Sequence, residues 1–139
     1  MLRVAIVLLT GLFVSGCGVA CTLIGCNNSV SFQLGTAAQN FGLNEPVLVK
    51  ACAGARCAEE TVTLTADGSS STGPALRLVS GTLVFDFNTP VSGAVTVSLE
   101  LRKNGNVVFT SSRDGVTFSN LQPNGPGCAP VCQQATLTL

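Results

Sequence analysis

Cysteine is the residue type in this 139-residue chain that could do the most chemistry, because there are seven cysteines and no histidine. Closely spaced thiols can form disulfides, hold a metal ion or exchange electrons. Zinc ribbons and redox motifs use Cys-x2-Cys, whereas the three close pairs here enclose four, four and three residues. The spacing therefore favours three disulfides. The cysteines that lie close together in the sequence are Cys21 and Cys26, Cys52 and Cys57, and Cys128 and Cys132.

The connectivity of these cysteines follows only in part from the sequence. Cys52 and Cys57 flank a four-residue turn, and opposed positions on a hairpin bring two Cα atoms within the roughly 4.4–6.8 Å that a disulfide spans. The other four cysteines are expected to pair locally, each within its own close pair. The alternative is cross-pairing between the two ends of the chain, which requires the first and last strands to be neighbours.

The seventh cysteine, Cys17, follows an apolar run and two small residues. Arg3, the stretch Val4–Val14 and Ser15-Gly16 supply the positive start, the apolar core and the small residues of a secretory signal. The stretch is far shorter than the roughly 20 apolar residues that span a bilayer, so an uncleaved transmembrane helix is the weaker alternative. The segment Phe13–Gly18 resembles the lipobox of bacterial lipoprotein precursors.

This resemblance implies that residues 1–16 are a signal peptide and that Cys17 is acylated by diacylglycerol at the new N-terminus. Cleavage before Cys21, after Gly18-Val19-Ala20, is the alternative. It leaves an odd number of cysteines, whereas cleavage before Cys17 leaves six others that pair completely. The expected location is the outer face of the plasma membrane or the outer membrane of a bacterium, with lipid bound only through Cys17.

Short strands with period-two alternation fill the rest of the chain, and no segment has a helical period. Asn104-Gly105 is the strongest short hairpin signal, and residues 67–74 have the composition of a loop. Strands are expected at 29–34, 46–53, 58–65, 76–79, 82–87, 95–103, 107–111, 116–119 and 134–139.

Seven to nine short antiparallel strands at about 10-residue spacing are typical of an immunoglobulin-like β-sandwich. The expected fold is therefore an all-β, disulfide-braced sandwich at 29–139, behind a lipidated tether at 17–28. The Cys…Trp…Cys core of true immunoglobulin domains is absent, since the chain has no tryptophan.

Composition excludes several kinds of site. Without histidine, tryptophan or tyrosine there is no imidazole base, and only phenylalanine remains to stack on sugars or bases. Without Arg3, six basic residues face seven acidic ones, and no basic cluster marks a nucleic-acid binder. We expect no catalytic activity, no metal ion, no nucleic acid and no small-molecule cofactor.

Three further patterns have structural interpretations that outweigh the functional ones. Asp86 and Asn88 supply oxygens, but calcium requires six to eight. Glu59 and Glu60 are adjacent on a strand and point to opposite faces, which prevents them from acting as a paired acid and base. Threonines alternate with other residues at positions 61, 63, 65, 136 and 138. This pattern is typical of the solvated face of a sheet, and an ice- or glycan-binding surface is the alternative.

The segment 121–132 is the most unusual loop, with three prolines next to two cysteines. Prolines and a disulfide restrict a loop before any partner arrives, which lowers the ordering cost of binding. The candidate partner-binding residues are Pro123, Asn124, Gly125, Pro126 and Pro130.

Together, the lipobox and the three cysteine segments resemble small lipoproteins of bacterial envelopes. The leading hypothesis is a non-enzymatic interaction or structural module whose partners are membrane lipid, through acylated Cys17, and an envelope protein. The alternative is an anchored inhibitor or ligand-binding protein that presents the loop 121–132.

Overall fold

The chain is all-β. The computed structural model describes Cys21 and residues 24–65, 70–71 and 73–139, so Cys17 and the signal segment lie outside the described residues. The elements are β1 (Asn28–Gln33), the 3-10 helix η1 (Gly35–Asn40), β2 (Pro46–Ala53), β3 (Arg56–Leu64), β4 (Ser70–Ser71), β5 (Leu76–Val79), β6 (Thr82–Phe87), β7 (Val95–Lys103), β8 (Asn106–Val116), β9 (Ser119–Leu121) and β10 (Cys132–Thr138).

Four strands, β2, β5, β6 and β7, have the predicted bounds. The expected count of seven to nine was wrong, because the described residues contain ten strands, two of them very short. The expected strand at 116–119 was also wrong. Pairing with β7 continues to Val95 opposite Val116, so β8 runs on past residue 111 to Val116, and β9 begins only at Ser119.

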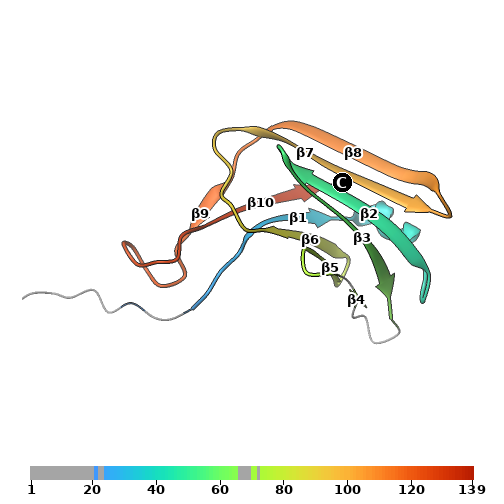
Figure 1. Cartoon of the computed structure of the whole chain (residues 1–139), viewed down its shortest axis with the longest axis horizontal. Helices are drawn as coiled ribbons and strands as arrows, with labels where there is room; N and C mark the ends of the chain where they lie inside the picture. Colours follow the sequence, from blue (N-terminus) through green and yellow to red (C-terminus); the bar gives the residue numbers. More distant parts are fainter. Residues whose placement is uncertain (1–20, 22–23, 66–69, 72) are drawn as a thin grey trace, which may run out of the picture.

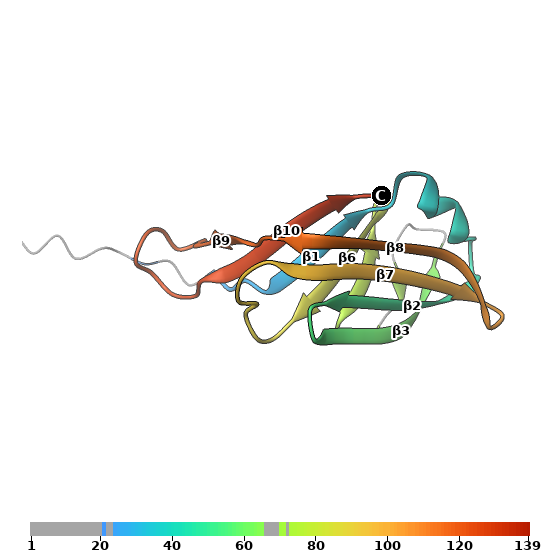
Figure 2. The same cartoon turned by 90° about the horizontal axis from the view of Figure 1, so that it is seen from above.

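The strands form two five-stranded sheets, which Figures 1 and 2 show as two layers. The first sheet has the order β5-β6-β1-β10-β9, and the second has the order β4-β3-β2-β7-β8. The expectation of a fully antiparallel arrangement was wrong at one place. Strands β1 and β10 pair in parallel, with Ser29 opposite Gln134 and Gln33 opposite Thr138, because both strands start at the same end of the molecule.

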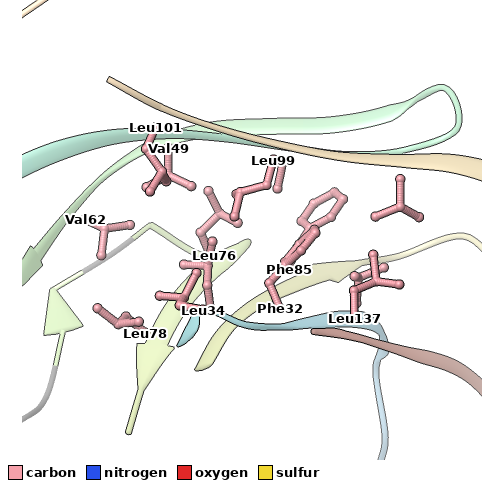
Figure 3. Close-up of a cluster of buried hydrophobic side chains, with 14 of the residues drawn as sticks. Phe32, Leu34, Val49, Val62, Leu76, Leu78, Phe85, Leu99, Leu101 and Leu137 are labelled. Carbon is pink, nitrogen blue, oxygen red and sulfur yellow. The ribbon is translucent and has the colours of Figure 1, made fainter. Parts of the chain in front are cut away.

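A single hydrophobic core fills the space between the sheets (Figure 3). Buried side chains alternate with more exposed ones along β6 and β7. At the centre of the first sheet, Phe32 is 1% exposed and lies in register between Leu83 of β6 and Leu137 of β10. The residues of β6 and β7 that face the core are Leu83, Phe85, Phe87, Val97, Leu99 and Leu101.

Glu59 and Glu60 lie on opposite sides of β3, as predicted, with Glu59 exposed. The Glu60 carboxylate accepts hydrogen bonds from the backbone N–H groups of Ala75, at 3.2 Å, and Leu76, at 2.9 Å. Glu60 therefore ties β3 of the second sheet to the start of β5 in the first sheet.

Candidate functional site

Two disulfides cross-link the start of the described chain to its C-terminal loop. Cys21 pairs with Cys128, with Cα atoms 5.7 Å apart, and Cys26 pairs with Cys132, with Cα atoms 6.0 Å apart. The expected local pairing was wrong. Because β1 and β10 are parallel neighbours, the segments that lead into them run side by side and bring these cysteines together.

The third disulfide joins Cys52 and Cys57 across the β2–β3 hairpin, as predicted. Their Cα atoms are 4.1 Å apart, slightly closer than the range usual for a disulfide. Three disulfides indicate an oxidising compartment outside the cytoplasm. No described helix is long and apolar enough to cross a membrane.

The segment 24–27 and the loop 121–131 together form one end of the molecule, which we call the tip. It lies at the opposite end from the β7–β8 turn in both views (Figures 1 and 2). Asn124 holds the two parts of the tip together. Its Oδ1 accepts a hydrogen bond from the Ile24 N–H at 2.9 Å, and its Nδ2 donates to the carbonyl oxygens of Ile24, at 3.0 Å, and Ala129.

The candidate partner-binding residues of the loop therefore differ in accessibility. Asn124 is only 5% exposed, and its amide is engaged with the backbone. Pro123 and Gly125 are half-buried, and only Pro126 and Pro130 are exposed. The structure places Asn124 as an internal brace, and it leaves two of the five candidates accessible to a partner.

We expect Asn124→Ala to lower the free energy of unfolding by about 1–3 kcal/mol, because the partly buried backbone groups of Ile24 and Ala129 lose their hydrogen-bond partner. Gln122→Ala, at an exposed position of the same loop, is the matched control and should change stability by less than about 0.5 kcal/mol. Urea unfolding of the oxidised protein measures both. Equal stabilities of the two variants would contradict the bracing role.

A concavity of about 510 Å³ lies between the tip and the outer face of the first sheet. Ser29 lies between Asp86 and Gln134 in one row across that sheet, and this row lines the concavity. Arg77 borders it from β5. The tip contributes Ile24, Gly25, Cys26, Asn27, Leu121 and Pro123.

Asp86 is the acidic group in the lining of this concavity. Burial raises the pKa of its carboxyl above the ordinary value of 3.8, while the Arg77 guanidinium and a side-chain hydrogen bond from Asn27 act in the opposite direction. The Arg77 Nη2 atom lies 3.4 Å from Asp86 Oδ2. Asp86 Oδ1 is buried and makes no hydrogen bond to any described residue.

The pKa of Asp86 makes a prediction about the pH dependence of stability. The folded state holds the Asp86 proton more tightly than the unfolded state does, so this group is most favourable to folding below pH 3.8 and that contribution is lost as pH rises through the raised pKa. The free energies of unfolding of the wild type and Asp86→Asn are compared by urea unfolding between about pH 3 and 7. As pH rises, the stability of Asp86→Asn should increase relative to that of the wild type.

The matched control is Arg77→Gln, which removes the neighbouring positive charge. It should raise the pKa of Asp86 further, since the Arg77 charge lowers that pKa. The pH range over which stability is lost should therefore extend to higher pH. A stability difference between wild type and Asp86→Asn that does not change with pH would contradict the assignment.

The remaining candidates do not assemble into a site. Asp86 and Asn88 line a second concavity of about 190 Å³, and within the described residues no three Asp, Glu or Cys side chains gather as metal ligands. The threonines at 61 and 63 lie on β3, whereas those at 136 and 138 lie on β10 in the other sheet. They therefore form no common surface.

Neither the concavity nor the bracing by Asn124 was predicted from the sequence. The concavity is made of residues from five strands, the segment 24–27 and the loop after β9, and no local spacing indicates such a set. Comparison of the chain with protein-family models, with curated proteins and with solved structures found no match.

Proposed function

We propose that this protein is an exported lipoprotein, attached to a bacterial membrane by acylated Cys17, whose β-sandwich serves as a non-enzymatic interaction or structural module of the cell envelope. The lipobox-like segment supports the anchor, and the three disulfides fit a compartment outside the cytoplasm. Two acyl chains on one residue give lasting attachment, where a single chain gives only marginal binding.

The crossed disulfides are the observation that carries this proposal. If residues 17–28 were a free tether, its extended length would reach roughly 40 Å. Cys21 is instead fixed to Cys128, so only four Cα-to-Cα steps separate Cys17 from the braced domain. At about 3.3–3.6 Å per residue they span no more than about 14 Å. A module held so close to its anchor works at the membrane surface.

The strand order supports an immunoglobulin-like topology for this module. In immunoglobulin domains one sheet contains strands D, E and B side by side, and the other contains C′, C, F and G. Here β5-β6-β1 and β3-β2-β7-β8 fit those two sets in sequence and in order. Strand β10 occupies the place beside β1 where strand A would lie. Such topology is shared by many unrelated functions, so it bears on architecture alone.

Metabolic labelling with a fatty acid tests the anchor. The full-length protein expressed in bacteria should incorporate the label and sediment with membranes, and Cys17→Ser should abolish the labelling. Cys21→Ser is the matched control and should remain labelled, because it removes only a disulfide partner. Labelling that persists in Cys17→Ser and disappears in Cys21→Ser would place the lipid on Cys21 and refute the proposal in its present form.

A ligand-binding function is the second candidate, and the concavity over Asp86 favours it over presentation of the loop. The ion pair of Asp86 with Arg77, beside Ser29 in the lining, suits a small polar ligand. A photo-crosslinking amino acid at Gln134, an exposed residue of the lining, and another at the exposed Pro126 separate the alternatives in intact cells. A small-molecule adduct at position 134 alone supports the concavity, and a protein adduct at position 126 alone supports the loop.

A further inference from the structure

The tip carries exposed apolar side chains and no charge. Neither the segment 24–27 nor the loop 121–131 contains an Asp, Glu, Lys or Arg. Ile24 is 55% exposed, Leu121 41% and Val131 47%, and the exposed Pro126 and Pro130 lie in the same loop. Grouped apolar side chains on a soluble domain mark an interaction surface.

The tip is also cross-linked by disulfides and hydrogen bonds. Two disulfides and the Asn124 hydrogen bonds fix the segment 24–27 against the loop. A surface that is ordered before binding loses little conformational entropy when it docks.

The position of the anchor indicates what covers this surface. Cys17 stands four residues before Cys21, which is bonded to the loop of the tip, so an acyl chain on Cys17 enters the bilayer within about 14 Å of that bridge. Anionic lipid surfaces attract clustered Lys and Arg side chains, and the tip has none. Its chemistry instead matches the boundary between headgroups and acyl chains, where exposed Ile, Leu and Val side chains are buried.

We propose that the tip is a membrane-contacting surface, in which Ile24, Leu121 and Val131 insert into the lipid interface and hold the sandwich upright on the bilayer. This inference rests on the proposed lipid anchor and adds a second contact to it. The sequence alone had assigned the only membrane contact to the acyl group. In this orientation the β7–β8 turn, at the opposite end of the molecule, points away from the membrane (Figure 2).

Single tryptophan reporters in the lipidated full-length protein test the contact, because the chain has no tryptophan or tyrosine of its own. Val131→Trp places the reporter on the tip. Val108→Trp is the matched control, since Val108 is 40% exposed near the opposite end, against 47% for Val131. Both proteins are reconstituted into phosphatidylcholine vesicles with brominated acyl chains, which quench tryptophan in contact with them.

We expect quenching at position 131 to be at least about twofold stronger than at 108, with a blue-shifted emission, since interfacial side chains reach roughly 5–10 Å into the headgroup and acyl boundary. The difference should persist in about 1 M salt, because screening acts only on charges. Equal quenching of the two reporters in vesicle-bound protein, or a difference abolished by salt, would overturn the tip contact alone. Protein that fails to float with the vesicles would overturn the anchor and the contact together.

Discussion

Removing both crossed disulfides should cost more stability than the sum of the two single removals. With one bridge intact, the other closes a ring of only about 11 residues, and the chain-entropy relation gives about 3 kcal/mol for its loss. When both are absent, a loop of more than 100 residues is also released, which brings the total to about 7–8 kcal/mol. Because small domains have only about 5–15 kcal/mol of stability, the quadruple variant should be largely unfolded.

The variants are Cys21→Ala with Cys128→Ala, Cys26→Ala with Cys132→Ala, and all four together, each measured by urea unfolding. The hairpin bridge is the control: it closes a short loop and its loss, in Cys52→Ala with Cys57→Ala, should cost about 2 kcal/mol and add independently to the other changes. A quadruple variant that loses no more than the two pairs combined would contradict the shared-loop explanation.

Thiol labelling of the same variants tests the connectivity itself. With crossed pairing, the Cys21→Ala and Cys128→Ala protein has no free thiol among the remaining described cysteines, because Cys26 and Cys132 still pair. Local pairing would leave both of those cysteines unpaired and reactive. Two labelled thiols would therefore refute the crossed arrangement.

The strands whose bounds were predictable are those with explicit turn chemistry at their ends. Asn104 and Gly105 both adopt positive φ, as the hairpin signal requires, and they separate β7 from β8. Ser80 and Gly81 do the same between β5 and β6. Turn residues act locally, so the sequence around them contains the information that fixes these ends.

The parallel pairing of β1 with β10 was not predictable by the same means. Alternation shows which side chains face the core, but a strand alternates identically whether its neighbour is parallel or antiparallel. The error about the disulfides has the same origin. Close spacing suggests a local bridge only where the two cysteines oppose each other on a hairpin, as Cys52 and Cys57 do. Among the described residues, Cys21 and Cys26 both precede the first strand, which begins at Asn28.

Asn124 shows why the candidate site was only partly predictable. Its position in a Pro-Asn-Gly-Pro run correctly indicates a turn, and the Gly125 N–H does bond to the Gln122 carbonyl. Asparagine serves equally well as an exposed turn residue and as a buried brace for backbone groups. The choice depends on whether a distant segment covers the turn, here residue 24, which is 100 positions away.

Phe32→Ala should be the most damaging single substitution in the core, with a loss of about 3–5 kcal/mol in the free energy of unfolding. Phe32 is 1% exposed on the central strand of the first sheet, and it faces the second sheet in the cluster that includes Phe85 and Leu99 (Figure 3). Truncation leaves a cavity in the core. Because β1 is paired with β6 on one side and with β10 on the other, it cannot move inward to fill that cavity.

Ser31→Ala is the control for this substitution, because Ser31 is the neighbouring residue on the outer face of the same strand and is half-buried. It should change the unfolding free energy by less than about 1 kcal/mol. The urea midpoint of each oxidised protein measures the contrast. If Phe32→Ala cost no more than Ser31→Ala, the two sheets would not be held together by the core at this strand, and the disulfides at the tip would have to supply most of the stability.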